Sequence, residues 1–231
     1  MDEVFRGVVH PEKEMKVQII STYYREEYLA PLFMLHNENW VDEVTFITER
    51  WEGDKLDDGA KVEAINTAIL RSTANWVIVV DADEYVYPKN GANPRTTLER
   101  ETGDIMNCEM LRVWRHMSDQ DVDRMKPPLL QRRHGGPDHV KPCIFRPGAV
   151  RLDIGNHSAN FPAEYKWGKP WSAVHWANAD PEFGIERTHR DRQTRLSENN
   201  YKHSWGMIPE WLDPNYLRDL YAKHMDDPIV I

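Results

Sequence analysis

The sequence predicts an α/β fold with a mostly parallel central sheet flanked by helices. Three short apolar runs, at 17–20, 44–48 and 76–80, are rich in β-branched residues and have the composition of strands. Two stretches with helical spacing of apolar residues lie between them. Because parallel strands need such crossover connections, this alternation predicts a Rossmann-like sheet in the first half of the chain.

The first two strand and helix units follow from the spacing of their apolar residues. The run 17–20 ends at Thr22, and the segment 25–37 that follows carries apolar residues at helical spacing, namely Leu29, Leu32, Phe33 and Leu35. The run 44–48 leads into a polar loop at 49–58. A second helix follows, and its apolar face includes Val62, Ile65, Ala68 and Ile69.

The third strand ends in an acidic cluster. Residues 76–80 form an uninterrupted apolar run, which is typical of a central parallel strand covered on both faces. The run stops at Asp81-Ala82-Asp83-Glu84, and open α/β sheets bind ligands beyond the carboxyl ends of their strands. Two carboxylates separated by one residue suit Mg²⁺ or Mn²⁺, which prefer carboxylate, water and phosphate oxygens. The cluster therefore predicts a divalent-metal site at this edge.

The pattern is looser beyond residue 88. We expect short elements there, namely a helix at 96–100 and strands at 107–114, 143–146 and 150–154. The polar stretch 115–139, which contains Pro127-Pro128 and Gly135-Gly136-Pro137, is predicted to form loops around a site. The tail from residue 182 has the pattern of two short amphipathic helices separated by Pro209 or Pro214.

Charge is unevenly distributed along the chain. The formal net charge is −9, yet residues 112–203 carry 16 Lys and Arg against 11 Asp and Glu, together with four of the nine tryptophans. This basic middle segment could bind phosphate and sugar or a nucleic-acid backbone, and it could equally be a mixed solvated surface.

Cysteine usage and hydropathy bear on the compartment. Cys108 and Cys143 are far apart and lack CxxC spacing, so we expect neither a zinc site nor a disulfide, and a reducing cytoplasm is the simplest compartment. The longest apolar runs fall far short of the ~20 residues that span a bilayer. The first residues lack the basic start and apolar core of a secretion signal. We expect a cytoplasmic protein without integral membrane association.

Three motifs occur in a fixed order around the predicted parallel sheet. Thr22-Tyr23-Tyr24-Arg25-Glu26-Glu27 follows the first strand, Gly59-Ala60-Lys61-Val62-Glu63-Ala64-Ile65-Asn66 opens the second helix, and Asp81-Ala82-Asp83-Glu84-Tyr85 follows the third strand. In these motifs the chain resembles the family 2-like GT-A glycosyltransferases, with Glu replacing the commoner Asn in the first motif. The downstream block Lys141-Pro142-Cys143-Ile144-Phe145-Arg146-Pro147, then His157 and His175-Trp176, resembles a subset of that family, which more often has Tyr after the second His.

The resemblance covers residues 15–180, most strongly through residue 88, and implies a nucleotide-diphosphate sugar donor, a UDP-sugar foremost. It implies a donor-binding set of Thr22, Tyr24, Arg25, Glu49, Lys61, Asp81, Asp83 and Lys141. It also implies a site for Mn²⁺ or Mg²⁺ with Asp83, His175 and His157 as ligands. Asn66 is expected to fix the geometry of a loop.

The resemblance also implies a catalytic base, if the reaction inverts the anomeric carbon. Such a base takes the proton of the acceptor hydroxyl. The candidates are the acids after the D-x-D motif, namely Asp121, Asp123, Asp138 and Asp153, and we choose Asp138, which follows Gly-Gly-Pro and precedes His139. The acceptor is a glycan or lipid-linked glycan, or a hydroxymethylated base in DNA, for which the arginines of the basic middle segment would suit phosphate tracking.

We expect one catalytic GT-A domain at 1–180, with a donor half at 15–88 and an acceptor half at 104–180. Residues 181–231 are expected to form a helical extension packed on the same domain. Two rival functions stay open. A nucleotidyltransferase would need a glycine-rich loop after the first strand, and residues 21–27 contain no glycine. A nucleotide-sugar-binding module without catalysis would share the fold.

Overall fold

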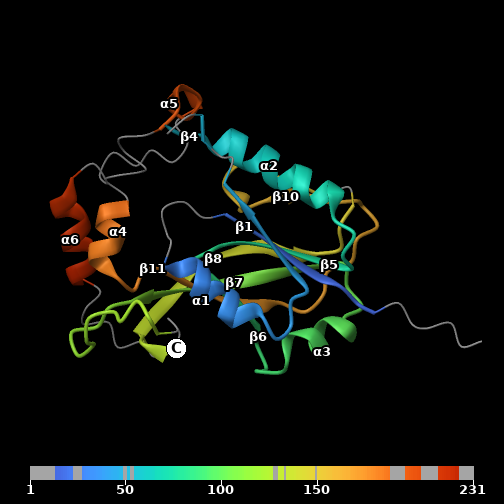
Figure 1. The fold of residues 1–231 in the computed structure, drawn as a ribbon, viewed down its shortest axis with the longest axis horizontal. Helices are drawn as coiled ribbons and strands as arrows, with labels where there is room; N and C mark the ends of the chain where they lie inside the picture. Colours follow the sequence, from blue (N-terminus) through green and yellow to red (C-terminus); the bar gives the residue numbers. More distant parts are fainter. Residues whose placement is uncertain are drawn as a thin grey trace, which may run out of the picture.

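The computed structural model describes residues 14–22, 28–48, 51–52, 55–126, 130–132, 134–148, 150–187, 196–203 and 213–223. A seven-stranded sheet runs through the centre of this part of the chain (Figure 1). The strand order is β2 (Glu43–Ile47), β1 (Val17–Thr22), β5 (Trp76–Asp81), β8 (His134–Phe145), β7 (Ile105–Trp114), β11 (Trp171–Asn178) and β6 (Glu84–Pro88).

Strands β2, β1 and β5 form the parallel half of the sheet, as the sequence predicts. β1 pairs in parallel with both neighbours, and Thr22 at its carboxyl end lies beside Ile47 on one side and Asp81 on the other. The crossover helices are α1 (Leu29–Asn37) and α2 (Asp58–Arg71). The α/β class and the Rossmann-like alternation are therefore confirmed, and the carboxyl ends of the two central strands meet at one edge.

The other half makes the sheet mixed, which corrects the expectation of a mostly parallel sheet. β8 is antiparallel to both β5 and β7, and β6 is antiparallel to β11, whereas β7 and β11 are parallel. The strand β6 begins directly after the acidic turn and was not predicted. Because β6 returns the chain along β11, it brings the acidic turn beside residues from far later in the sequence.

Part of the predicted loop 115–139 is strand. β8 begins at His134, and Gly135-Gly136-Pro137 pairs with Val113, Arg112 and Leu111 of β7. The sequence favours a turn there because glycine and proline usually interrupt strands. The register between β7 and β8 shifts next to Pro137, between Glu109 and Leu111. This irregularity accommodates a residue that cannot donate to the ladder.

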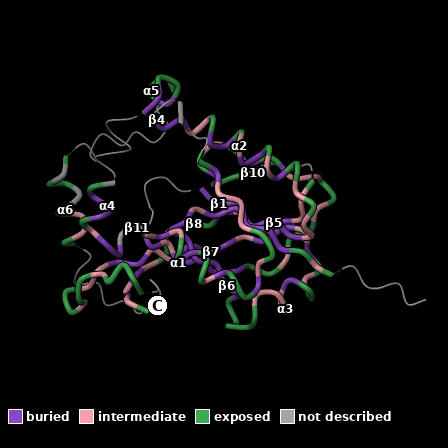
Figure 2. Tube along the Cα trace, viewed as in Figure 1, coloured by how far each residue is buried: buried purple, intermediate pink, exposed green. Residues whose placement is uncertain are grey.

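The core lies on both faces of the sheet. On one face Ile78 and Phe33 of α1 belong to a buried cluster, and on the other Val77 packs with Ile65 and Ile69 of α2. Figure 2 shows the buried residues concentrated along the sheet between these helices. The apolar run of β5 is thus covered on both sides, as its composition predicts.

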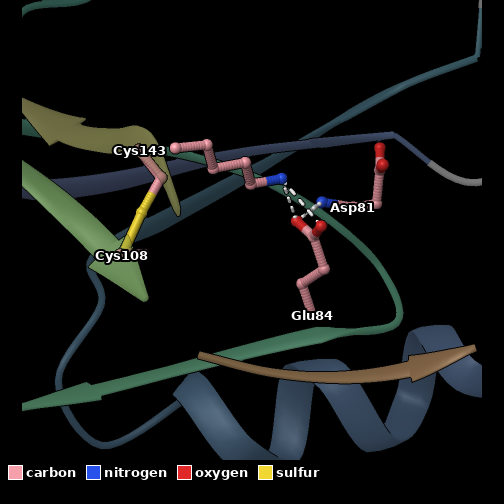
Figure 3. The surroundings of a disulfide bond; sticks show 5 residues. Asp81, Glu84, Cys108 and Cys143 are labelled. Atoms are coloured by element: carbon pink, nitrogen blue, oxygen red, sulfur yellow. Dashed lines mark hydrogen bonds and ion pairs between the residues drawn. A yellow bond between two sulfur atoms is a disulfide. The ribbon is translucent and has the colours of Figure 1, made fainter. Parts of the chain in front are cut away.

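Cys108 and Cys143 form a disulfide, which corrects the expectation of unpaired cysteines (Figure 3). Their Cα atoms are 6.0 Å apart although the residues are separated by 35 positions in sequence. Cys108 of β7 lies opposite Lys141 of β8, and the register shift between Met106 and Asn107 places Cys143 diagonally across. Strand pairing brings the two cysteines together. Because they are bonded to each other, they no longer indicate a reducing compartment.

Smaller elements complete the fold. They are the hairpin β3 (Trp51–Glu52) and β4 (Lys55–Leu56), the helix α3 (Pro94–Glu99), the ribbon β9 (Arg151–Leu152) and β10 (Ala159–Asn160) with the 3-10 turn η2 (Ile154–Asn156) between them, and the helices α4 (Pro181–Arg187), α5 (Glu198–His203) and α6 (Pro214–Lys223). The described tail thus holds three helices where two were predicted.

Of the two prolines predicted to separate the tail helices, Pro209 lies outside the described residues, and Pro214 falls at the boundary of α6. It is the first residue of α6, a position where proline costs nothing because its missing N–H would have no helical partner. None of the described helices is both long enough and apolar enough to cross a bilayer.

Candidate active site

Thr22 and Asp81 meet at the carboxyl edge of the parallel half. The parallel register of β1 and β5 places them side by side, and the Thr22 hydroxyl donates to Asp81 Oδ1. Lys61, in the first turn of α2, places its Nζ 3.1 Å from the same oxygen. The Asp81 side chain is 36% exposed, so it can still meet a ligand. Three of the predicted donor-binding residues are thus brought together.

A buried ion pair of Glu84 and Lys141 contacts the acidic turn. Glu84 Oε2 accepts the amide hydrogen of Asp81 at 2.9 Å (Figure 3). Lys141 Nζ lies 2.7 and 2.5 Å from the two oxygens of Glu84, and both side chains are 3% exposed. Burial opposes the charge on Lys141, but Glu84 and Asp81 outweigh it and raise the pKa of Lys141.

This placement changes the expected role of Lys141. The family resemblance implies that Lys141 binds the donor, but its ammonium is buried against Glu84. Its geometry suits holding the turn in place. Glu84 belongs to the predicted acidic cluster, but its ion pair with Lys141 was not predicted.

Asp83 faces His175. The antiparallel register of β6 and β11 sets His175 opposite Glu84, and the Trp176 amide donates to the Asp83 carbonyl at 2.8 Å. This pairing brings His175 Nε2 to 3.5 Å from Asp83 Oδ2. The other ring nitrogen, Nδ1, lies 3.2 Å from Asp138 Oδ2. Two predicted metal ligands are therefore adjacent.

The His175 ring lies between two carboxylates. Burial alone would lower its pKa, but the charge of Asp83 and the hydrogen bonds with Asp138 and Asp83 raise the pKa of His175 to about 9. In the absence of a metal ion, the imidazolium form is the stable one at neutral pH. A metal ion at Nε2 would displace that proton.

The Asp138 carboxylate contacts one arginine and two histidines. Arg112 donates to it from Nε at 3.1 Å and from a terminal nitrogen at 2.7 Å, while His139 and His175 approach the same carboxylate at 3.3 and 3.2 Å. Burial would raise the pKa of Asp138, but the hydrogen bonds from the two histidines and the charge of Arg112 lower it well below its usual range. A carboxylate so stabilised is a poor proton acceptor. The structure thus favours orientation of His175 over the base role predicted for Asp138.

The third predicted metal ligand, His157, lies against His139. Its ring packs edge to face against His139, with centroids 4.5 Å apart. Burial lowers the pKa of His157, and the positive charges of His139 and Lys141 act in the same direction. The turn before it uses left-handed backbone at Gly155 and Asn156, with φ of 84° and 59°.

Asn66 anchors this turn to α2, as predicted for a residue that fixes a loop. Its side-chain amide donates to the Leu152 carbonyl at 3.1 Å and accepts the Leu152 amide hydrogen at 2.8 Å. Both groups are buried, so the pair of bonds fixes where β9 ends and the His157 turn begins.

The described residues suit a two-ligand metal site. No three His, Cys, Asp or Glu side chains among them are grouped to hold a metal ion, so the predicted trio of Asp83, His175 and His157 is not assembled. Asp83 and His175 do face each other through Oδ2 and Nε2. Mg²⁺ and Mn²⁺ sites in nucleotide enzymes often rest on one or two protein ligands, with phosphates and water completing the shell. Asp83 and His175 fit such a site.

Tyr24, Arg25 and Glu49 fall outside the described residues. Three other candidates for the base lie in local contacts, with Asp121 paired to Arg115, Asp123 to Lys126, and Asp153 hydrogen-bonded to Ser158.

Arg112, Arg115 and Arg132 of the basic middle segment contact acids, whereas Arg133, Arg190, Arg192 and Arg195 lie outside the described residues. Arg112 binds Asp138, Arg115 binds Asp121, and Arg132 lies 3.8 Å from Asp119 while donating to the Ala179 carbonyl at 2.9 Å. An arginine that pairs with an acid of the protein contributes less positive charge to the binding of nucleic-acid phosphates.

Comparisons with known proteins give only distant likenesses. No family model matches the chain, and no curated protein matches it. Among solved structures, S. aureus TarS 1-349 has 12% identity and a TM-score of 0.33, with 87% of this chain and 72% of that chain covered. Its complex with UDP has 12% identity, a TM-score of 0.35 and coverage of 91% and 89%. The complex with UDP-GlcNAc has 12% identity, a TM-score of 0.32 and coverage of 87% and 73%. These likenesses are too weak to decide an activity.

Proposed function

We propose that the protein is a glycosyltransferase that moves a sugar from a nucleotide diphosphate, UDP foremost, to an acceptor hydroxyl with the help of a divalent metal ion. The observation that carries the proposal is the convergence of Thr22, Lys61 and Asp81 with the facing pair Asp83 and His175. They gather beyond the carboxyl ends of β1 and β5, where open α/β sheets bind nucleotides.

Each residue has a distinct task in this proposal. Asp81, held by Thr22 and Lys61, presents its partly exposed carboxylate to the ribose or diphosphate. Asp83 and His175 would hold Mn²⁺ or Mg²⁺, which neutralises the charge that develops on the diphosphate leaving group. Arg112 and Asp138 fix the orientation of the His175 ring, since a hydrogen bond at Nδ1 leaves Nε2 for the metal ion.

The reaction is a displacement at the anomeric carbon. A bond forms between the acceptor oxygen and that carbon as the bond to the diphosphate oxygen breaks, and the acceptor proton passes to a base. A glycan or a lipid-linked glycan is the acceptor that we favour over a hydroxymethylated base in DNA. The reason is that three arginines of the basic middle segment, Arg112, Arg115 and Arg132, pair with acids within the protein.

Ligand-induced thermal stabilisation tests the donor half of the proposal without knowledge of the acceptor. UDP, GDP, CMP and dTDP would each be added with and without Mn²⁺ to the wild type and to Asp83→Ala. A ligand at about 100 times its Kd stabilises the folded state by about 2.7 kcal/mol. We expect a metal-dependent rise of the unfolding midpoint with UDP that is absent in Asp83→Ala and present in the matched control Asp219→Ala, an exposed acid on α6.

Other results separate the rivals. No stabilisation by any nucleotide would overturn the proposal. Stabilisation by UDP without release of free sugar from any UDP-sugar would indicate a binding module. Turnover of nucleoside triphosphates with a sugar phosphate would indicate a nucleotidyltransferase.

A further inference from the structure

A short segment near the C-terminus packs against the start of α2. Leu196 forms a parallel bridge with Leu56 of β4, and both side chains are buried. The Ser197 amide donates to the Leu56 carbonyl at 2.8 Å. This segment therefore continues the small hairpin that leads directly into α2.

Polar side chains complete the contact. The Ser197 hydroxyl donates to Asp57 Oδ2 at 2.9 Å. Asn200 Oδ1 accepts the amide hydrogen of Asp58 at 2.9 Å, and Asn200 Nδ2 donates to Asp58 Oδ2 at 2.9 Å. Ser197 and Asn200 are both 0% exposed. We call Asp57, Asp58, Ser197 and Asn200 the C-terminal clasp.

The C-terminal clasp provides hydrogen-bond acceptors for amide hydrogens in the first turn of α2. Helices begin with amide hydrogens that have no helical acceptor, and here Asn200 accepts that of Asp58 while Asp57 Oδ1 accepts that of Ala60 at 2.8 Å. Burial would raise the pKa of Asp57, but the hydrogen bonds from Ala60, Ser197 and Asn199 lower it. The helix start is therefore held by groups from about 140 positions later in the chain.

Lys61 leaves α2 from this same turn. Its amide donates to the Asp57 carbonyl at 2.9 Å, and its Nζ lies 3.1 Å from Asp81 Oδ1. The side chain is largely buried, so its reach is set by where the helix begins. A shift of the first turn would carry Lys61 away from Asp81.

We propose that the C-terminal clasp is a positioning element of the donor site, which holds the first turn of α2 and thereby keeps Lys61 against Asp81. This inference rests on the proposed function to the extent that Lys61 and Asp81 meet a nucleotide diphosphate. Its positioning residues are Ser197 and Asn200, which touch no reacting group.

A charge exchange within the C-terminal clasp tests the inference. Asn200→Asp keeps the size of the side chain but sets a carboxylate against Asp58 and removes the donated hydrogen bond. Adding Asp58→Asn restores the pair with reversed polarity, because an amide at position 58 can donate to a carboxylate at position 200. Lys202→Ala, an exposed change on the same helix α5, is the matched control.

Three quantities would be measured: the Kd of UDP with Mn²⁺, KM and kcat for UDP-sugar hydrolysis, and amide hydrogen exchange at 58–62. For Asn200→Asp we expect about a tenfold rise in Kd and KM, little change in kcat and faster exchange at 58–62. The double variant should return all three to near wild-type values, and Lys202→Ala should leave them unchanged.

The possible failures are distinct. Faster exchange in Asn200→Asp with unchanged Kd and KM would mean that the segment only stabilises α2, and the inference would be overturned. Unchanged exchange would overturn it as well. If the wild type binds no nucleotide, the proposed function fails, and rescue of the exchange rates by the double variant still decides whether the C-terminal clasp holds the helix start.

Discussion

The parallel and antiparallel halves of the sheet contribute to the candidate site in different ways. In the parallel half, Thr22 and Asp81 reach the edge at neighbouring strand ends, and the Asp81 side chain is 36% exposed. In the other half, Lys141 pairs with Glu84, and both side chains are only 3% exposed. The parallel half thus carries the more exposed charged group, and the other half contributes a buried ion pair that contacts the same turn.

The largest expected effect is on stability and comes from the buried pair. Lys141→Met leaves Glu84 charged and without its partner inside the protein, which typically costs about 3–5 kcal/mol. The free energy of unfolding from urea denaturation measures the loss. Adding Glu84→Gln should recover part of it, because the unpaired charge is then gone.

A surface pair on the same sheet supplies the control. Lys89 and Glu109 also form an ion pair, but their side chains are 40% and 46% exposed. Lys89→Met should cost less than about 1 kcal/mol. Equal losses of unfolding free energy for Lys141→Met and Lys89→Met would contradict the view that a buried ion pair stabilises the antiparallel half of the sheet.

The second effect is a dependence of stability on pH through His175, which faces Asp83, Asp138 and Glu84. The folded pKa of about 9 lies above the unfolded value of about 6.5, so the stabilisation is fully present below pH 6.5 and is lost as the pH rises through 9. Its size is on the order of 3 kcal/mol. Unfolding free energies between pH 6 and 10 in chelator would show the fall, and His175→Gln should flatten it. Parallel curves for the two proteins would show that His175 is not the source.

The contrast between the halves explains what the sequence could predict. The alternation of strands and helices follows local patterns. The site residues Thr22, Lys61 and Asp81, which the family resemblance implies, lie within 90 residues of one another in sequence and meet in the fold. The partners of the second half are set by register between distant strands. Arg112 meets Asp138 across 26 positions and His175 meets Asp138 across 37.

Composition does not encode such a register. Asp138, Lys141 and the cysteines meet their neighbours only when β6, β7, β8 and β11 pair, and the disulfide that results was not predicted. A buried charge takes its function from the group opposite, which single-sequence patterns do not specify.

The third effect separates a positioning residue from a base at Asp138. Asp138→Asn retains the shape but loses the charge that orients the His175 ring through its Nδ1, so we expect kcat/KM to fall about 10–100-fold with the shape of the pH profile retained. A general base would lose about 10²–10⁴-fold and the acid limb of the profile. The pH dependence of UDP-sugar turnover distinguishes the two. Arg112→Lys, which keeps the charge but loses the two-pronged contact, should show a smaller fall in the same direction.

The smallest effect concerns Asn66, which links α2 to the separate ribbon of β9 and β10. This residue of α2 makes two buried hydrogen bonds to the backbone of Leu152, and the His157 turn follows directly. Asn66→Ala should lower the free energy of unfolding by about 1–2 kcal/mol, because the Leu152 amide and carbonyl lose their partners. A looser turn also exposes His157, so its pKa, now lowered by burial, should rise toward the ordinary value.

NMR titration of the histidine rings would follow that change, with the exposed neighbour Thr67→Ala as control. Loss of stability with an unchanged His157 titration would mean that Asn66 supports α2 alone. A shifted titration would show that the helix of the parallel half also sets the electrostatics of the antiparallel half, since His157 lies against His139 and senses Lys141.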